Sequence, residues 1–238
     1  MAQKKVNAVI HSQEKLAEGI YSMWLDAPEM AEAAVPGQFI AVYTNDQSKL
    51  LPRPISICEA DKENGRLRIV YRIAGAGTKE FSAYKEGDTL DIMGPLGNGF
   101  PLKKKKAFLI GGGIGIPPML ELAKNLDCEK TAVIGYRDKE TFLADELRKY
   151  ADVVIATEDG SVGTKGNVID AIRAEKLTAD IIYACGPTPM LKALKTYAME
   201  NGIECYISLE EKMACGIGAC LGCVCHSKDI DEHSNVRN

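Results

Sequence analysis

The sequence predicts a protein of the β plus α/β class, in which an N-terminal antiparallel β-barrel precedes a parallel-sheet domain and a cysteine-rich C-terminal segment. Three observations predict this class. Short alternating apolar runs fill the first hundred residues, buried runs alternate with amphipathic stretches from residue 107, and four cysteines fall within residues 215–225. The length of 238 residues is comfortable for two domains and an appendage, with boundaries expected at 1–102, 103–209 and 210–238.

The first domain is expected to be an antiparallel barrel or sandwich, because its apolar residues alternate or occur in short β-branched runs. Turn signals such as Pro36-Gly37 separate these runs. Trp24 lies in an alternating stretch and is expected in the core. The expected strands cover residues 6–10, 20–25, 38–43, 67–73 and 89–93, and a further strand opens at Arg53.

The second domain is expected to contain a parallel sheet with helices on both faces. Short buried strands are expected at 107–112, 131–136, 153–157, 180–185 and 204–209, and helices near 117–126, 140–150, 167–176 and 188–201. The four lysines at 103–106 mark the break before this domain and are interpreted as a solvated linker face.

The composition excludes several function classes. With 29 Lys and Arg against 33 Asp and Glu, the net charge of −4 gives no field that would hold a polyanion, so neither nucleic acid nor a membrane surface is expected as a partner. No run of 18 apolar residues and no secretory h-region is found, so a cytoplasmic protein is expected. The clustering of the last four of eight cysteines favours a metal over disulfides.

The strongest local signal is the cysteine spacing C-x4-C-x2-C formed by Cys215, Cys220 and Cys223. Plant-type 2Fe-2S clusters use this spacing, because a loop wraps a compact cluster while several thiolates point inward. The intervening glycines admit positive φ and let backbone amides approach the inorganic sulfides. A zinc loop is the alternative, although zinc sites favour separated pairs of closely spaced ligands.

A fourth thiolate is needed for such a cluster. The next cysteine, Cys225, lies one residue beyond Cys223 in the motif, and its side chain would point the opposite way in an extended segment. We therefore expect the fourth ligand to lie beyond the given sequence, with Cys225 as a lesser candidate.

Two strand-to-helix junctions of the second domain carry the signs of nucleotide binding. Glycines at 111, 112, 113 and 115 follow a buried strand and precede Pro117, and exposed amides at such a helix start bind pyrophosphate. The spacing differs from G-x-G-x-x-G, so a tight turn alone is the alternative. A second junction follows Cys185, at the carboxyl edge where ligands of α/β sheets bind.

The first domain contains two further strings. Arg53-Pro-Ile-Ser56 offers a guanidinium for phosphate and a hydroxyl for a ring edge. The small-residue turn at 75–78 follows the stretch 70–72 and could seat a pyrophosphate. Either string alone also fits an ordinary strand end or hairpin turn.

Taken together, the strings RPIS, YRIAGAGT, GPLGNGF, GGGIGIPP, ACGPTPM and LEEKMACGIGACLGC resemble the ferredoxin-reductase-like flavoproteins. Within these, the resemblance is closest to the electron-transfer subunits of dihydroorotate dehydrogenase B. It implies an FAD-binding barrel, an NAD-binding domain and a 2Fe-2S segment that faces a catalytic partner. It also implies positions for the cofactors: Arg53, Pro54, Ile55, Ser56, Val70, Tyr71, Arg72, Gly77 and Thr78 for FAD; Gly111, Gly112, Gly113, Gly115, Cys185, Gly186 and Pro187 for NAD; Cys215, Cys220 and Cys223 for the cluster.

The function implied by this resemblance is electron transfer from the FMN of a catalytic dihydroorotate-oxidising subunit, through 2Fe-2S and FAD, to NAD+ in pyrimidine biosynthesis. A heterotetramer of two plus two subunits is implied, and no catalytic side chain is assigned in this chain. The alternatives are a homologous subunit of a sulfhydrogenase or a ferredoxin-NADP transhydrogenase, and a zinc-stabilised binding module. The choice of NAD over NADP is also implied by the family. The residues leave it open, because Arg137 favours the 2′-phosphate of NADP and Asp138 favours the ribose hydroxyl of NAD.

Overall fold

The chain is represented by a computed structural model that describes residues 4–46, 48–209, 213–217, 219–220 and 222–223. These residues form two compact units. The first unit contains the chain up to Gly99 together with the described residues of the cysteine loop. The second contains residues 100–209. Each unit is described by itself.

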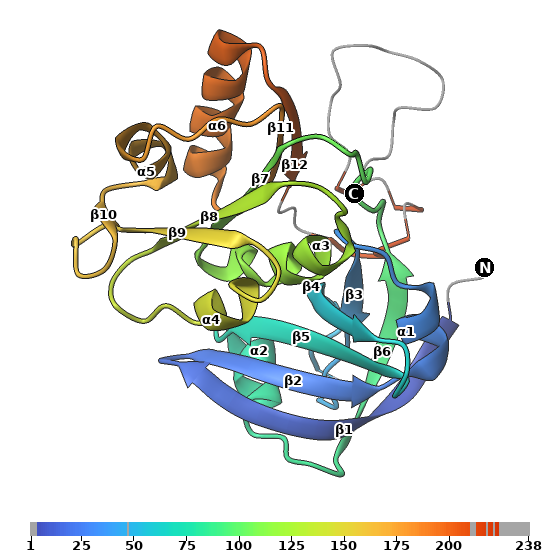
Figure 1. Ribbon diagram of the computed structural model, residues 1–238. Helices are drawn as coiled ribbons and strands as arrows, with labels where there is room; N and C mark the ends of the chain where they lie inside the picture. Colours follow the sequence, from blue (N-terminus) through green and yellow to red (C-terminus); the bar gives the residue numbers. More distant parts are fainter. Residues whose placement is uncertain (1–3, 47, 210–212, 218, 221, 224–238) are drawn as a thin grey trace. The chain divides into compact units, whose positions relative to one another are not determined.

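The first unit is a closed antiparallel β-barrel with the strand order β1-β2-β5-β4-β3-β6 (Figure 1). Pairing of β6 with β1, from Lys4 opposite Gly94 to Val9 opposite Thr89, closes the barrel, so its strands leave no open edge. Its elements are β1 (Lys4–Ala17), β2 (Ile20–Asp26), α1 (Pro28–Ala33), β3 (Phe39–Val42), β4 (Arg53–Asp61), β5 (Arg66–Arg72), α2 (Ala76–Phe81) and β6 (Thr89–Leu96).

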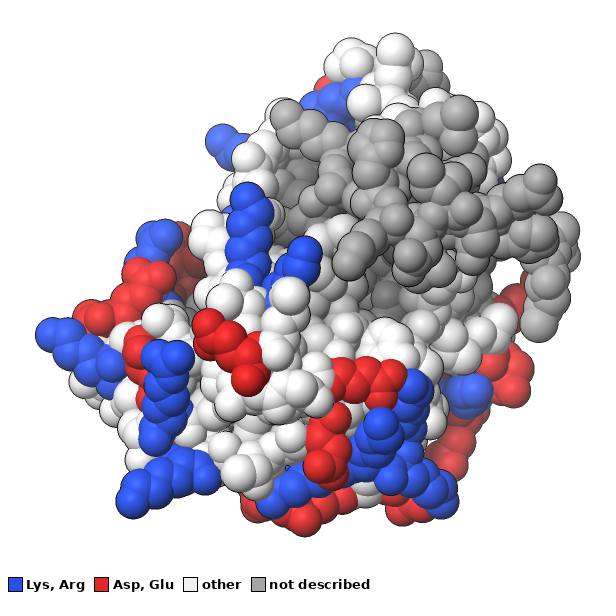
Figure 2. Space-filling view, turned by 90° about the horizontal axis from the view of Figure 1, so that it is seen from above, with Lys and Arg blue, Asp and Glu red and all other residues white. Residues whose placement is uncertain are grey.

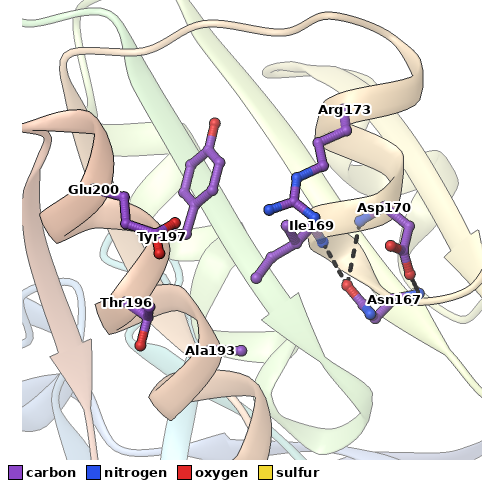
Figure 3. Close-up of a pocket in the computed structure, with 8 residues that line it drawn as sticks. All are labelled: Asn167, Ile169, Asp170, Arg173, Ala193, Thr196, Tyr197 and Glu200. Carbon is purple, nitrogen blue, oxygen red and sulfur yellow. Dashed lines mark hydrogen bonds between the residues drawn. The ribbon is translucent and has the colours of Figure 1, made fainter.

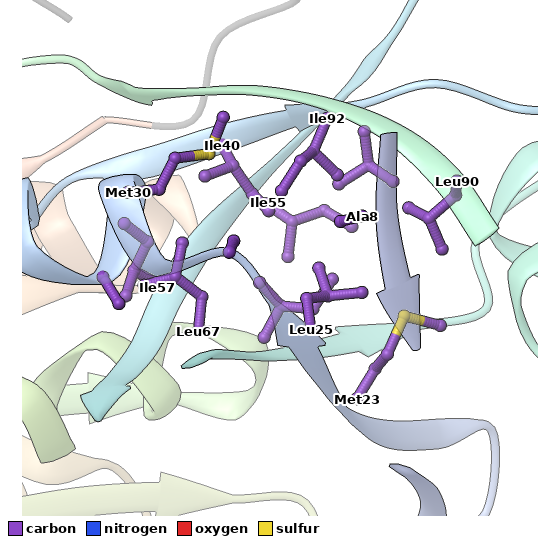
Figure 4. Close-up of a cluster of buried hydrophobic side chains, with 14 of the residues drawn as sticks. Ala8, Met23, Leu25, Met30, Ile40, Ile55, Ile57, Leu67, Leu90 and Ile92 are labelled. Atoms are coloured by element: carbon purple, nitrogen blue, oxygen red, sulfur yellow. The ribbon is translucent and has the colours of Figure 1, made fainter. Parts of the chain in front are cut away.

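The barrel interior is filled by one apolar cluster, to which every strand contributes alternate residues (Figure 4). Met23, Leu25, Ile40, Ile57 and Leu67 are each at most 1% exposed. The prediction that Trp24 belongs to this core is wrong. Its neighbours Met23 and Leu25 point inward, whereas the Trp24 ring is only half-buried.

Arg68 explains the position of Trp24 on the outer face of the barrel. The Arg68 guanidinium carbon lies 5.7 Å from the Trp24 ring centroid, and its Nε donates to Ser22 Oγ at 2.9 Å. The alternation in β2 therefore marked the correct strand, but the indole packs under a guanidinium instead of in the core.

The second unit is a six-stranded parallel sheet with the order β10-β9-β8-β7-β11-β12. Helices α5 and α6 pack on one face of the sheet, and α3 and α4 lie on the other (Figure 1). Its elements are β7 (Ala107–Gly112), the 3-10 turn η1 (Gly113–Gly115), α3 (Pro117–Asn125), β8 (Lys130–Tyr136), α4 (Ala144–Leu147), β9 (Asp152–Thr157), β10 (Thr164–Lys165), α5 (Val168–Ala174), β11 (Ile181–Cys185), α6 (Thr188–Asn201) and β12 (Glu204–Ser208).

Two predicted local structures differ from those observed. The helix expected at 140–150 contracts to the single turn α4, because Leu143 adopts φ +64° and Glu140 and Thr141 close turns before it. The turn expected at 75–78 is instead the start of a short helix, α2, in which the hydroxyl of Thr78 caps the first turn.

The lysine run at 103–106 is not merely a solvated linker face, because all four side chains meet carboxylates at the amino ends of the strands. Lys103 and Lys105 both contact Glu204, which begins β12. The other two pairs are Lys104 with Asp127 at 2.9 Å and Lys106 with Glu129 at 2.6 Å.

Charge of either sign is spread over the described surface. On the face that Figure 2 presents, Lys and Arg side chains alternate with Asp and Glu, in keeping with the small net charge. Among the described residues, no helix is both long and apolar enough to cross a membrane.

Candidate functional site

The topology of the parallel sheet has one switch point, between β7 and β11. The chain leaves β7 toward β8, β9 and β10, and then returns to the other side of β7 as β11 and β12. Ligands of open α/β sheets bind at the carboxyl ends of the strands where the order reverses. Both predicted nucleotide-binding strings begin at this point, since Gly111 of β7 pairs with Cys185 of β11.

Backbone packing at the switch point leaves no room for side chains at two of the predicted glycines. A Cβ on Gly115 would lie 2.2 Å from the carbonyl oxygen of Cys185, and one on Gly111 would lie 2.8 Å from Cα of Ile116. Gly186, at φ +158°, approaches Gly112 in the same way. The two junctions are thus held together by close contact, which glycine alone permits.

Gly113 differs from the other glycines of this turn. Its φ is +53°, and a Cβ there would meet no atom within 4 Å. The structure therefore has open space beside the backbone of this turn.

The start of α3 is a poorer anion site than the sequence predicted. Its first two positions are Pro117 and Pro118, which have no N–H, and the N–H of Met119 donates to the carbonyl of Ile116 at 2.9 Å. The N–H of Ile116 in turn donates to Gly113 O at 3.1 Å. Few amides of this helix start are therefore left for a pyrophosphate.

Arg137 and Asp138, the residues considered for the choice between NAD and NADP, directly follow β8. Arg137 is exposed. The carboxylate of Asp138 accepts the N–H of Glu140 at 2.9 Å and so shapes the turn after β8. Both residues follow the carboxyl end of β8, which pairs with β7 up to Gly135 opposite Gly112.

In the barrel, the predicted flavin residues Arg53 and Gly77 are in direct contact. The position of a Cβ on Gly77 is filled by the Arg53 side chain, whose Nε would be 2.1 Å away. Arg53 Nη1 also donates to the carbonyl of Leu51 at 2.5 Å. The guanidinium therefore lies against the first turn of α2, where a positive charge next to backbone amides fits the diphosphate of FAD.

The other predicted flavin residues fall into two groups, one at least partly exposed to solvent and one buried. Pro54 and Arg72 are exposed and Ser56 is half-buried, so these three present atoms outside the core. The side chains of Ile55, Val70 and Tyr71 are buried, and the Tyr71 hydroxyl donates to Gln13 Oε1 at 2.8 Å. Burial raises the pKa of Tyr71. A contact from these three residues to a flavin would come from the backbone.

Thr78 is committed to the helix start. Its Oγ1 accepts the N–H groups of Ala74 at 2.9 Å and Gly75 at 3.2 Å, and it donates to the carbonyl of Gly75 at 3.1 Å. The hydroxyl therefore shapes the turn against which Arg53 lies.

A carboxylate that the sequence analysis did not single out lies in the last turn of α2. Glu80 Oε1 accepts the N–H of Asn45 at 2.8 Å and the hydroxyl of Tyr84 at 2.6 Å. Glu80 Oε2 accepts from Lys49 Nζ at 2.6 Å. The Lys49 ammonium and the other donors outweigh desolvation and lower the pKa of this carboxyl. No spacing in the sequence links residue 80 to residues 45–49, so only the tertiary structure finds this contact.

The described part of the cysteine loop has the features that an iron–sulfur site requires. Gly216 has φ +71° and lies against the barrel, where a Cβ would be 3.3 Å from Leu96 Cδ1. The N–H of Cys220 donates to Cys215 Sγ at 3.4 Å. This bond, with further ones from the backbone of Ile217 and Ala219, lowers the pKa of Cys215 to about 6. Amides that stabilise a thiolate are the surroundings in which cluster sulfurs are bound.

The three predicted cluster ligands differ in burial: Cys223 is 4% exposed, Cys215 is half-buried and Cys220 is exposed. Within the described residues, no group of three or more His, Cys, Asp or Glu side chains is gathered as a metal site. Cys225 lies outside the described residues.

One pocket of about 340 Å³ lies between α5 and α6 (Figure 3). Arg173 and Tyr197 face each other across it, and Asn167 caps α5 at its edge. None of the predicted site residues lines this pocket.

Comparison with known proteins finds matches to the barrel, to the cysteine segment and to the chain as a whole. Residues 7–100 match the oxidoreductase FAD-binding domain, and residues 210–237 match the iron-sulfur cluster binding domain of dihydroorotate dehydrogenase B. The chain is 44% identical over 234 residues to the dihydroorotate dehydrogenase B (NAD(+)) electron transfer subunit of Geobacillus sp. strain WCH70, covering 94% of this chain and 90% of that protein. It is 45% identical over 242 residues to the subunit of the same name from Streptococcus mutans, covering 98% and 93%.

Solved structures agree with these matches. The structure of the NADH-dependent reduced ferredoxin-NADP oxidoreductase, studied for flavin-based electron bifurcation, is 32% identical with a TM-score of 0.85, and the match covers 91% of this chain and 81% of that one. The ferredoxin reductase of carbazole 1,9a-dioxygenase, at 20% identity, a TM-score of 0.73 and coverage of 87% and 69%, shares the fold. The chain belongs to the family of dihydroorotate dehydrogenase B (NAD(+)) electron transfer subunits.

Proposed function

We propose that this chain is the subunit that carries electrons from a catalytic, FMN-containing dihydroorotate dehydrogenase subunit to NAD+ in pyrimidine biosynthesis. We further propose a heterotetramer of two plus two subunits that works in the cytoplasm. Flavin binding is assigned to residues 1–102, nucleotide binding to 103–209 and the cluster to 210–238.

The observation that carries this proposal is the match of residues 210–237 to the cluster domain of dihydroorotate dehydrogenase B, on the same chain as an FAD-binding domain. NAD exchanges pairs of electrons and an iron–sulfur cluster exchanges single ones, and bound FAD supplies the chemistry that connects the two. A chain with all three sites is therefore suited to electron transfer between a nucleotide and a protein partner.

The flavin is assigned to the outer face of β4 and the start of α2. Arg53 supplies positive charge at the first turn of α2, where Gly77 leaves room for the guanidinium. Thr78 holds that turn in place through its hydrogen bonds to Ala74 and Gly75. The full set assigned to FAD is Arg53, Pro54, Ile55, Ser56, Val70, Tyr71, Arg72, Gly77 and Thr78.

The nicotinamide nucleotide is assigned to the switch point of the sheet. The chain's contribution there is steric, because Gly113, in the turn after β7, leaves open space beside the backbone. The assigned residues are Gly111, Gly112, Gly113, Gly115, Cys185, Gly186 and Pro187.

The cluster is assigned to Cys215, Cys220 and Cys223. Hydrogen bonds from backbone N–H groups lower the pKa of the Cys215 thiol and so favour the thiolate, which is the form that binds metal. Substitution of Cys215 by Ser is expected to lower the iron and acid-labile sulfide bound per chain to a small fraction of the wild-type value. The matched control is Cys128→Ser, which changes a thiol in the second unit and leaves both contents unchanged.

The test of the whole proposal uses the full-length protein, expressed with and without the catalytic subunit. The purified chain is expected to contain flavin, iron and labile sulfide and to oxidise NADH with artificial acceptors. It is expected to oxidise dihydroorotate only with its partner. A chain that binds zinc and shows no visible absorption, or one that converts dihydroorotate alone, would contradict the proposal.

A second candidate is an electron-transfer subunit of a ferredoxin-NADP oxidoreductase complex. It is favoured by the TM-score of 0.85 and the 32% identity to the NADH-dependent reduced ferredoxin-NADP oxidoreductase structure. Co-purification separates the two candidates, because only the first predicts a partner that oxidises dihydroorotate.

A further inference from the structure

The loop before β4 is fastened to α2 by one carboxylate. Besides Asn45, Tyr84 and Lys49, Glu80 also receives the N–H of Asp46, at 3.3 Å from Oε1. Isolated surface ion pairs contribute little to stability. Glu80 differs from such a pair, since its side chain is only 17% exposed and four donors, three from the loop before β4 and one from Tyr84, converge on it.

The loop itself is closed by its own hydrogen bonds. The N–H of Lys49 donates to Asp46 O at 3.0 Å, and Ser48 donates to the Asp46 carboxylate through both its backbone and its hydroxyl. Thr44 Oγ1 reaches Asp46 O at 3.2 Å and Lys49 O at 3.4 Å. Lys49 is therefore hydrogen-bonded to Asp46 and Thr44 as well as to Glu80.

The segment that follows this turn leads directly to the flavin residues. Only Leu50, Leu51 and Pro52 separate Lys49 from Arg53. Helix α2 holds both ends of the segment: Glu80 in its last turn binds Lys49, and Gly77 in its first turn receives the Arg53 side chain. Between these two attachments, Leu50 and Leu51 are 84% and 56% exposed, so core packing does little to fix this stretch.

We propose that Glu80 is a positioning residue for FAD. The pairing of β4 with β3 holds the backbone of Arg53 opposite Val42. By holding Lys49 on α2, Glu80 fixes the segment that leads into β4, and with it the position of the Arg53 side chain at the first turn of that helix. Its effect on FAD is indirect, through Arg53. This inference rests on the proposed flavin site and adds a residue that the sequence strings did not contain.

The competing interpretation is that Glu80 only stabilises the barrel. The two roles differ in a measurable way, because ligand binding raises the melting temperature by an amount set by the dissociation constant. A residue with a purely structural role lowers the melting temperatures of the FAD-free and FAD-bound proteins alike. A positioning residue reduces the difference between them.

The experiment uses the full-length chain with the variants Glu80→Gln and Lys49→Met, and Glu86→Gln as the matched control. Glu86 is an exposed carboxylate in the turn before β6. The readouts are the dissociation constant of FAD, from titration of the FAD-free protein, and the rise in melting temperature caused by saturating FAD.

Glu80→Gln is expected to raise the dissociation constant of FAD about tenfold, because a charge-assisted contact to Lys49 is lost. Lys49→Met is expected to raise it in the same direction, and the double variant less than the product of the two, because both remove one interaction. Glu86→Gln is expected to leave both readouts at the wild-type value.

The inference is overturned if Glu80→Gln leaves the FAD-dependent rise in melting temperature unchanged, even where both melting temperatures fall. If Glu80→Gln does not fold, Lys49→Met decides by the same criterion. If the wild-type chain binds no FAD, the proposed function itself is wrong. If the wild-type chain and Glu80→Gln bind FAD equally well, only the role of Glu80 is wrong.

Discussion

The two regions assigned to cofactors are built in different ways. At the switch point of the sheet, backbone meets backbone, and Gly115 lies against the carbonyl of Cys185. At the flavin region of the barrel, a flexible side chain meets backbone, and Arg53 lies against Gly77. Backbone that is paired on both sides cannot yield, whereas an arginine can rotate away. The nucleotide region should therefore tolerate far less change than the flavin region.

The largest expected effect is that of Gly115→Ala. The new Cβ would lie 2.2 Å from Cys185 O, so the ends of β7 and β11 must separate. A displacement of this order at a binding site costs about a hundredfold in rate. NADH oxidation with an artificial acceptor should fall by that factor, while the FAD content per chain stays at the wild-type level.

Gly202→Asn is the control for that variant. Gly202 ends α6 at φ +64°, a conformation that asparagine adopts readily, and a Cβ there meets nothing within 4 Å. NADH oxidation is expected to be unchanged in this variant. Equal activity of Gly115→Ala and Gly202→Asn would show that the backbone contact at the switch point is not needed for nucleotide binding.

A smaller effect is expected for Gly77→Ala in the barrel. The added Cβ displaces only the Arg53 side chain, so the dissociation constant of FAD should rise about tenfold, in line with the loss of one charged contact. Gly75→Ala is the matched control, because Gly75 has extended backbone and no atom within 4 Å of its Cβ position. Fluorescence titration with FAD measures both. If the two variants bind FAD equally well, Arg53 does not hold the flavin from this position.

The smallest effect is expected at the amino end of the sheet, far along the strands from the glycine turn. The hydrogen bond from Lys103, with those from Lys105 and Tyr206, lowers the pKa of Glu204 to about 2 from an ordinary value of 4.5. A carboxyl with a lowered pKa stabilises the fold above its ordinary pKa, and this contribution is lost as the pH falls toward the lowered value.

Glu204→Gln should therefore lower the melting temperature at neutral pH by roughly 2–4 °C relative to the exposed control Glu175→Gln. The gap between the two variants should narrow below pH 4.5 and close near pH 2, which calorimetry across this range would show. A gap that stays constant through this pH range would mean that the charge of Glu204 does not contribute to stability.

Prediction from the sequence succeeded where the local pattern has one structural meaning. Buried runs such as 107–112 and 131–136 became β7 and β8 almost at the expected residues, because a short apolar run of this length, bounded by turn signals, is typical of a buried strand. It failed where several local patterns compete. Alternation in β2 did not tell which outward residue would be covered, so Trp24 was misplaced.

The candidate site was predictable to the same degree. The glycine strings and cysteine spacing can be recognised because each cofactor imposes its own residue types at a fixed spacing. The contact of Glu80 with the turn at 45–49 could not be recognised, since the two segments are more than thirty residues apart and neither has an unusual composition.

The sequence by itself determined the class of the fold, the order of the three binding segments and the chemistry of each, because strand periodicity and ligand spacing are local properties of the chain. Only the tertiary structure decided that Gly115 lies against the end of β11, that Arg53 lies on Gly77, and that four lysines pair with three carboxylates. Such contacts depend on which distant segments the closed barrel and the parallel sheet bring together, and no local sequence pattern specifies which segments meet.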